Sequence, residues 1–166
     1  MKETIVVAIT MLALMIGQAA DAANVVTGRV VGVADGDTIT VLDEAKTQHR
    51  IRLVGIDAPE SGQPFGQASK QSLSKMVYGK EVSILWEKQD RYGRILGKVV
   101  NPSWGDVNLA QVKAGMAWHY KRYMADQSAE DRMLYANEET SARQTRKGLW
   151  ADTNQVPPWD WRKANR

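Results

Sequence analysis

Residues 24–56 read NVVTGRVVGVADGDTITVLDEAKTQHRIRLVGI and contain three runs rich in β-branched residues. The runs cover residues 24–34, 38–42 and 48–56, and such composition predicts β-strands. Asp35-Gly36 is a strong signal for a tight turn between the first two runs, and residues 43–46 provide a second turn. Ala58-Pro59 ends the third run, because proline cannot donate a hydrogen bond to a sheet. The amino-terminal half of the domain is therefore predicted to be β-rich.

The rest of the chain alternates between helical and strand patterns. Glycine follows each predicted helix, at Gly79, Gly115 and Gly148, in the position where helices commonly end. Ser128, three residues before Asp131, is a capping signal for the start of the last of these helices. The expected elements are a helix within 65–78, strands over 81–86 and 95–100, a helix over 107–114, a helix from 128 to about 147, and an extended aromatic tail over 156–161.

The order of these elements indicates a fold class. Five short strands, with a helix inserted after the third and two helices at the end, are typical of a small closed barrel. We therefore expect an α+β protein built on a five-stranded OB-fold barrel with three α-helices. OB barrels often bind nucleic acids or sugars.

Composition narrows the chemistry that the chain can perform. The 166 residues include no cysteine, which excludes disulfides, thiolate metal sites and a cysteine nucleophile. Two histidines are too few for a histidine-rich zinc site, so any metal should be a hard cation on oxygen ligands. The net charge of +3 suits a partner with a phosphate backbone.

The first 22 residues have the pattern of a secretory signal peptide. Met1-Lys2 gives a positive start, residues 5–16 are apolar apart from Thr10, and Ala20-Asp21-Ala22 supplies a cleavage motif. An apolar run of this length is too short to span a bilayer, which argues against a membrane anchor. We expect cleavage after Ala22 or Ala23, export to the periplasm or the medium, and no stable membrane association afterwards. The domain is then predicted over 24–150, followed by an aromatic tail over 151–166.

Three short segments carry the candidate chemistry: DGDT (35–38), RLVGIDAPE (52–60) and DRYGR (90–94). Each alone is compatible with an ordinary turn or a solvated strand end. In a regular strand, Arg52 and Asp57 would lie on opposite faces. A turn near Gly55 or Pro59 would be needed to bring them into one site.

Together the segments fit phosphodiester hydrolysis. Two arginines can donate forked hydrogen bonds to phosphate, and two aspartates with a main-chain carbonyl can hold a divalent cation. A nearby glutamate can accept the proton of the attacking water.

The three strings, in this order, resemble the staphylococcal (micrococcal) nuclease family from about Val25 to Trp150. That resemblance implies a five-stranded OB barrel that hydrolyses DNA and RNA, leaving 3′-phosphate ends. A chain of this size is expected to be a monomer. The resemblance also implies Ca²⁺ as the cofactor. The implied calcium ligands are the carboxylates of Asp37 and Asp57 and the main-chain carbonyl of Ala58.

The resemblance also assigns roles to further residues. Glu60 would be the general base, and Arg52 and Arg94 would bind the phosphate and stabilise the transition state. Tyr92 follows the family pattern beside the phosphate, and Tyr120 matches a tyrosine that packs on the nucleotide base.

Two other functions remain open at this point. A catalytically inactive OB module could bind single-stranded nucleic acid, although it would have no need for the complete set of charged residues. A glycosidase could use Asp57 and Glu60 as its carboxylate pair, but that mechanism gives no role to Arg52 or Arg94.

Overall fold

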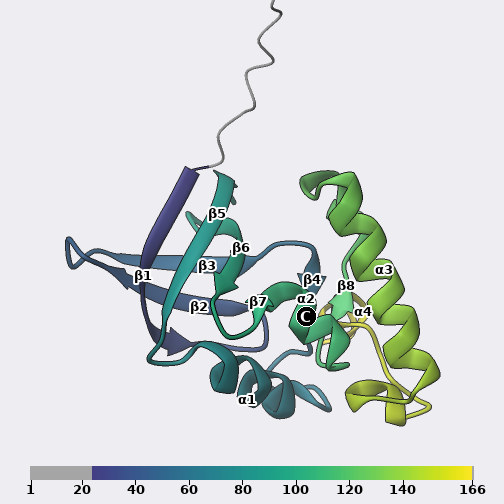
Figure 1. Cartoon of the computed structure of the whole chain (residues 1–166). Helices are drawn as coiled ribbons and strands as arrows, with labels where there is room; N and C mark the ends of the chain where they lie inside the picture. Colours follow the sequence, from purple (N-terminus) through teal and green to yellow (C-terminus); the bar gives the residue numbers. More distant parts are fainter. Residues whose placement is uncertain (1–23, 166) are drawn as a thin grey trace, which may run out of the picture.

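The computed structural model describes residues 24–165, whose core is a closed five-stranded barrel (Figure 1). Its long strands are β1 (Asn24–Val33), β2 (Thr38–Asp43), β3 (Gln48–Leu53), β5 (Glu81–Gln89) and β6 (Ile95–Asn101). Neighbours run antiparallel in the order β3-β2-β1-β5-β6, and β3 pairs in parallel with β6 to close the barrel. The predicted five-stranded OB-type barrel with helices is confirmed.

Alternating side chains fill the barrel. In β3, Ile51 and Leu53 point inward, whereas the intervening Arg52 is only partly covered, as the two-residue period of a strand requires. The strands contribute apolar residues that are at most 3% exposed, among them Val30, Ile39, Val41, Ile51, Leu53, Ile84, Ile95 and Val99. Closure leaves few unpaired strand edges, so the wall gives a rigid frame for the loops at its ends.

Three helices pack around the barrel as expected. They are α1 (Gly66–Val77), α2 (Val107–Lys113) and α3 (Ala129–Gln144). Leu73, Met76 and Val77 bury one face of α1 in the main core, and α2 packs on β6, α1 and α3. The side chain of Ser128 accepts a hydrogen bond from the amide of Asp131, which confirms the predicted amino-terminal cap of α3.

The predicted carboxyl-terminal end of the last helix is wrong. Helix α3 ends at Gln144, and Arg146, with φ 51°, takes the left-handed position that we had given to Gly148. The amide of Lys147 donates to the carbonyl of Ala142 at 2.9 Å, and that of Arg146 donates to Arg143 at 3.1 Å, a Schellman pair. Gly148 instead allows close backbone approach, since a Cβ there would lie 2.3 Å from the carbonyl oxygen of Gly115.

The third strand also ends earlier than predicted. Strand β3 stops at Leu53, and Val54-Gly55 turns the chain, with Gly55 at φ 77°. The chain then enters β4 (Ile56–Asp57), which pairs antiparallel with β8 (Trp118–His119). The turn is held by the amide of Val54, which donates to the carbonyl of Gly97 at 3.0 Å. A two-stranded patch therefore links the end of β3 to the helical half of the molecule.

The carboxyl-terminal segment is helical where an extended tail was predicted. Helix α4 (Pro158–Ala164) begins with Pro158 at its first position, where a fixed φ and a missing N–H are favourable. It lies beside β8, because the Trp159 ring packs edge-on against Trp118 with centroids 5.6 Å apart (Figure 1, yellow). Aromatic packing of Trp159 on Trp118 of β8, which local sequence does not encode, accounts for the error.

The remaining elements are short. They comprise β7 (Gly105–Asp106) and the 3₁₀ helices η1 (Lys121–Asp126) and η2 (Gly148–Ala151). The predicted signal peptide at 1–22 lies outside the described residues. Within residues 24–165, every helix falls short of the length and apolar character needed to cross a membrane.

The side chain of Asn108 on α2 joins the barrel to the turn after β3. Its amide nitrogen donates to the carbonyls of Val54 and Gly97, at 3.0 and 3.1 Å, and its oxygen accepts from the amide of Val99. We expect Asn108→Ala to lower the free energy of unfolding by about 1–3 kcal/mol, because it leaves buried backbone groups unpaired. Urea unfolding would measure the loss. Asn137→Ala, on the exposed surface of α3, is the matched control and should change little; equal losses would contradict the interpretation.

Candidate active site

The DGDT turn places Asp37 at the end of the barrel where β2 begins. The amide of Asp37 donates to Asp35 Oδ1 at 3.0 Å, and its carbonyl accepts from the amide of Leu53 at 2.8 Å. Gly36 is required by close packing, since a Cβ there would lie 1.8 Å from Ser69 Oγ and 2.7 Å from the Cβ of Ala58. The backbone around Asp37 is thus fixed from both sides.

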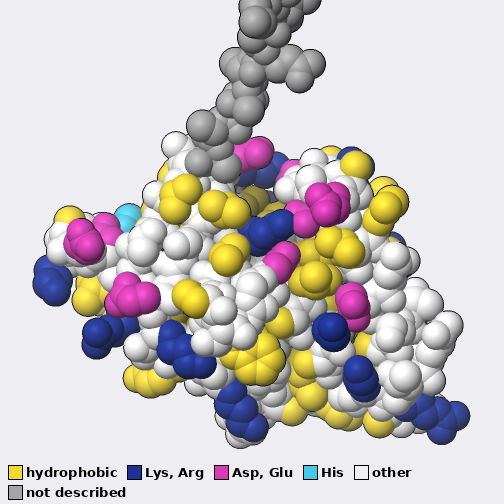
Figure 2. Space-filling model, viewed as in Figure 1, with side chains coloured by type: hydrophobic (Ala, Val, Ile, Leu, Met, Phe, Trp, Pro, Cys, Tyr) yellow, Lys and Arg dark blue, Asp and Glu magenta, His cyan; other side chains and the backbone are white. Residues whose placement is uncertain are grey.

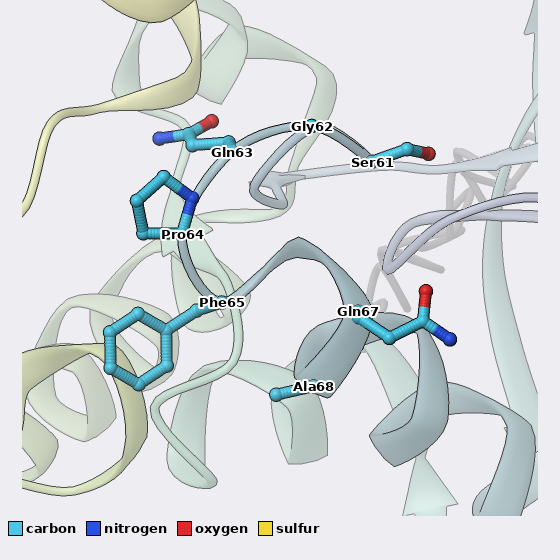
Figure 3. Close-up of a pocket in the computed structure, with 7 residues that line it drawn as sticks. All are labelled: Ser61, Gly62, Gln63, Pro64, Phe65, Gln67 and Ala68. Atoms are coloured by element: carbon cyan, nitrogen blue, oxygen red, sulfur yellow. The ribbon is translucent and has the colours of Figure 1, made fainter.

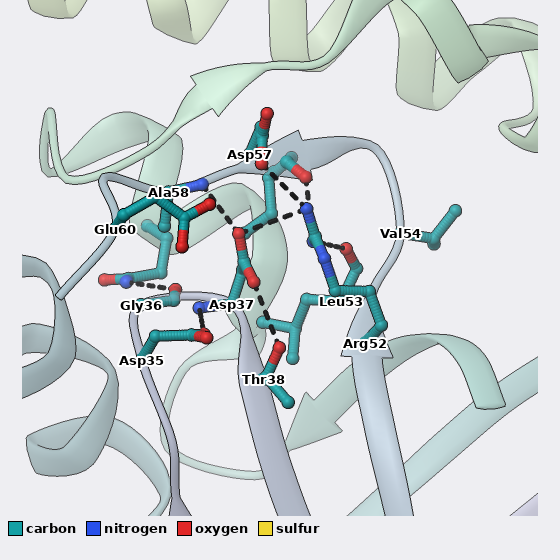
Figure 4. Close-up of polar contacts among 12 residues, drawn as sticks. Asp35, Gly36, Asp37, Thr38, Arg52, Leu53, Val54, Asp57, Ala58 and Glu60 are labelled. Atoms are coloured by element: carbon teal, nitrogen blue, oxygen red, sulfur yellow. Dashed lines mark hydrogen bonds and ion pairs between the residues drawn. The ribbon is translucent and has the colours of Figure 1, made fainter. Parts of the chain in front are cut away.

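Arg52 is the centre of the site (Figure 4). Its Nη1 donates to the carbonyls of Leu53 and Ile56, at 2.8 and 2.9 Å, so the turn at Gly55 wraps around the guanidinium. Its Nη2 lies 3.0 Å from Asp57 Oδ1 and 3.1 Å from Asp37 Oδ2. The turn needed to bring Arg52 and Asp57 together is therefore present.

Asp37 and Asp57 are both buried, at 5% and 1% exposure. Asp37 Oδ2 accepts from the amide of Ala58 at 2.7 Å, and Asp37 Oδ1 accepts from the hydroxyl of Thr38. Burial raises the pKa of Asp37 to about 7, against the opposing attraction of Arg52, while the charges of Asp35 and Asp57 raise it further. An uncompensated negative charge is costly at this position.

A second arginine, which sequence reasoning missed, completes the cluster. Arg162 of α4 donates from Nη1 to Glu60 Oε1 at 2.6 Å and to Asp57 Oδ1 at 3.2 Å, and from Nη2 to Asp57 Oδ2 at 2.8 Å. These hydrogen bonds raise the pKa of Arg162 above its ordinary value. We define the acidic cluster as Asp37, Asp57 and Glu60; Arg52 bridges the first two and Arg162 the last two. No local motif marks Arg162, because it reaches the barrel only through the packing of α4.

Arg94 has a different partner. Its Nε and Nη2 both lie 2.8 Å from Asp90 Oδ2, within the turn between β5 and β6. Leu96 is opposite Arg52 in the β3–β6 pairing, so Arg94 lies two residues from the register position of Arg52. In the described part of the chain, its guanidinium makes no hydrogen bond or ion pair with the acidic cluster. Tyr92 in the same turn is 69% exposed, with the guanidinium of Arg91 4.8 Å from its ring centroid.

Tyr120 borders an aromatic and basic pocket of about 310 Å³. Its ring is stacked on that of Trp159, with centroids 5.3 Å apart and planes 19° apart. We call this hollow the aromatic-basic pocket; its lining residues are Trp118, His119, Tyr120, Lys121, Arg122, Glu139, Arg143 and Trp159.

A larger open hollow of about 520 Å³ lies along the segment that follows Glu60 (Figure 3). Its lining residues are Ser61, Gly62, Gln63, Pro64, Phe65, Gln67 and Ala68, with no charged side chain among them. The charged side chains of this region therefore lie in the neighbouring acidic cluster and not in this hollow.

The oxygen atoms of the acidic cluster are suitable ligands for a hard divalent cation. Carboxylate and carbonyl oxygens are the ligands that Ca²⁺ and Mg²⁺ prefer, and water completes their coordination. Among residues 24–165, no three Asp, Glu or His side chains are arranged as a ready metal cage. The fit is therefore to two carboxylates, Asp37 and Asp57, with Ala58 held beside them by its hydrogen bond to Asp37.

The barrel therefore holds two buried carboxylates beside a fixed arginine and a glutamate, and comparison with known proteins supplies the family. Residues 50–152 match the family model described as staphylococcal nuclease homologue. An uncharacterized endonuclease of Escherichia coli is 48% identical over 135 residues, covering 81% of this chain and 84% of that protein. A micrococcal nuclease of Shigella flexneri is 42% identical over 147 residues, covering 84% and 82%.

A plant protein is similar to this chain over a shorter stretch. The staphylococcal-like nuclease CAN1 of Arabidopsis thaliana is 46% identical over 118 residues, which is 70% of this chain and 34% of the plant protein. The chain belongs to the staphylococcal nuclease family, and it is a nuclease.

The buried charge of Asp37 has a consequence for stability in the absence of metal. Because its folded-state pKa lies near 7, above the ordinary 3.8, the folded chain binds this proton more tightly than the unfolded chain. The resulting stabilisation is complete below about pH 4 and is lost as the pH rises through about 7. In EDTA, we expect Asp37→Asn to gain melting temperature relative to wild type between pH 5 and pH 8.

Thermal unfolding at several pH values would test this. Asp160→Asn, which removes an exposed carboxylate, is the control and should follow wild type. A difference between Asp37→Asn and wild type that stayed constant with pH would show that Asp37 does not titrate in this range.

Proposed function

We propose that this nuclease hydrolyses the phosphodiester bonds of DNA and RNA in a Ca²⁺-dependent reaction, acts as a monomer and leaves 3′-phosphate ends. The observation that carries the proposal is the shared Nη2 of Arg52, which lies within 3.1 Å of both Asp37 and Asp57. This contact supports the proposal because the two carboxylates that would bind the cation lie against the guanidinium that would bind the phosphate. When bound, the cation would polarise the phosphate and offset its negative charge.

Arg52 has the geometry of a preorganised phosphate ligand. Its Nη1 is held by two main-chain carbonyls, so the guanidinium plane is fixed before substrate arrives. The Nη2 hydrogens are now accepted by Asp37 and Asp57. If these carboxylates turn to a cation, the same hydrogens become available to a phosphate oxygen, where charge grows in the transition state. Arg94 would supply the second guanidinium after release from Asp90.

Glu60 is suited to act as the general base. Its main-chain amide is tied to Gln63 Oε1, while its side chain is 38% exposed, so water can reach the carboxylate. Glu60 would take a proton from the water that attacks phosphorus. The bond from phosphorus to the 5′ oxygen then breaks, the 5′ oxygen takes a proton from water, and Glu60 returns its proton to solvent, giving a 5′-hydroxyl on one product and a 3′-phosphate on the other.

The surface nearby suits a polynucleotide of any sequence. The aromatic-basic pocket offers Tyr120 for stacking on a base and Lys121 and Arg122 for phosphates. On the face of the molecule shown in Figure 2, Lys and Arg side chains lie along the lower edge, with apolar side chains between them. Base stacking tolerates all four bases, which favours cleavage without sequence preference.

We expect Glu60→Gln to reduce turnover by about 10²–10⁴-fold, the usual contribution of a general base. Acid-soluble fragments released from DNA and RNA, with Ca²⁺ or EDTA, would measure the rate, and end-group analysis would identify the 3′-phosphate. Oligonucleotide binding should persist. Glu44→Gln, in an exposed turn, is the control of identical chemistry. Unchanged turnover in Glu60→Gln would remove Glu60 from the reaction, and an inactive wild type that binds single strands would favour the binding-module alternative.

We also propose that residues 1–22 direct export to the periplasm or the medium. Mass spectrometry of the exported protein should find a chain that begins at Ala23 or Asn24. Leu12→Arg, which interrupts the apolar run, should retain the full-length chain inside the cell. An uncleaved wild-type chain would contradict the proposal.

A further inference from the structure

Helix α4 places two side chains of its own on the two parts of the candidate active site. Arg162 binds both oxygens of Asp57 and one of Glu60, as described above. Trp159 is stacked on Tyr120 in the aromatic-basic pocket. The two residues are three positions apart, so they project from the same side of the helix.

Each of these contacts resembles one that a ligand would make. A guanidinium on two carboxylates supplies positive charge where a divalent cation would bind, through strong charge-assisted hydrogen bonds. An indole ring stacked on a tyrosine takes the place that a nucleobase would take. The hydrogen bond from Arg162 also occupies Oε1, one of the two carboxylate oxygens of Glu60.

We propose that α4 is an autoinhibitory segment whose Arg162 and Trp159 occupy the cation and base subsites until divalent cation and nucleic acid displace them. This inference rests on the proposed function of the site. Binding of Ca²⁺ must then break the contacts of Arg162. The wild-type chain therefore binds Ca²⁺ more weakly than the same carboxylates would bind it without Arg162.

The contacts of α4 suit a segment that can leave. The side chain of Arg162 is 37% exposed, so water and ions reach it even though its partner Asp57 is buried. Release of the helix uncovers Pro158, which is buried, and the Trp159 ring, which packs on Trp118 and Tyr120, so a ligand has to replace these apolar contacts. Residues 152–157, which precede it, contain no helix or strand, and α4 takes no part in the barrel sheet. Gln63, which accepts from the amide of Glu60 and donates to the carbonyl of Val156, joins this segment to the site.

The decisive variant is Arg162→Gln in the full chain, with Lys163→Gln as its control. Lys163 is on the same helix, is exposed and pairs only with Asp160 among the described residues, so both substitutions remove one positive charge. Isothermal titration with Ca²⁺ should give about three- to tenfold tighter binding for Arg162→Gln, as expected for loss of a competing, partly exposed ion pair. Lys163→Gln should bind as wild type does. Equal or weaker Ca²⁺ binding by Arg162→Gln would overturn the proposal.

Hydrogen exchange gives a second readout that does not depend on turnover. In wild type, Ca²⁺ with a phosphorothioate oligothymidylate should increase amide exchange within residues 158–164. Arg162→Gln should show part of that increase without ligand, and circular dichroism should confirm that it is folded. Protection of residues 158–164 on oligonucleotide binding would instead make α4 a wall of the substrate site, and the autoinhibitory proposal would fail.

The two proposals fail in different ways. If neither wild type nor Arg162→Gln takes up Ca²⁺, the calcium dependence proposed above is wrong. Exchange at 158–164 with the oligonucleotide alone then decides whether α4 competes for the pocket. If both proteins bind Ca²⁺ with the same affinity, the autoinhibitory proposal is wrong while the calcium site stands.

Discussion

The guanidinium of Arg52 connects the fold to the site, because its donors serve both the backbone and the carboxylates. Two carbonyls of the turn after β3 accept from Nη1, and the two aspartates share Nη2. Without this cation, buried Asp37 and Asp57 would place two negative charges side by side, at a high electrostatic cost. The left-handed Gly55 lets the chain turn tightly enough to carry Asp57 back to the same guanidinium. The turn after β3 and the neutralisation of Asp37 and Asp57 therefore both depend on the same arginine.

Arg52 by itself leaves the acidic cluster with more negative than positive charges. Without Arg162, three carboxylates would share the single guanidinium of Arg52, and burial raises the pKa of Asp37 to about 7. An excess of negative charge favours a further positive group nearby, whether a cation or a side chain. The chain supplies a side chain from its own carboxyl-terminal helix, at the expense of a group that could otherwise act on water. The electrostatics of the barrel end thus explain why a distant arginine is drawn to it.

The barrel could be predicted from the sequence because the signals for its strands and turns are local. β-Branched runs, turn residues and the glycines at 79 and 115 each act within a few residues, and the strands and helices that they predict are present. The sequence also predicted that Asp37, Arg52, Asp57 and Glu60 belong to one site, and the structure places these side chains together, with Arg162 as a further contact. The end of α3 was misjudged because Arg146 adopts a positive φ that glycine would normally be chosen to provide. Helix α4 was missed because its seven residues are stabilised by docking rather than by their own propensity.

The attachment of α4 combines two interactions with different physical dependence. Trp159 packs on the cluster of Trp118 and Trp150, which also receives the Arg143 guanidinium 3.8 Å from the Trp150 centroid. This apolar contact is largely insensitive to ions, whereas the bonds of Arg162 to Asp57 and Glu60 compete directly with any cation. A cation alone would therefore release the arginine and leave the tryptophan in place. Only a ligand that also carries an aromatic base can replace both contacts, which makes full opening of the site depend on cation and polynucleotide together.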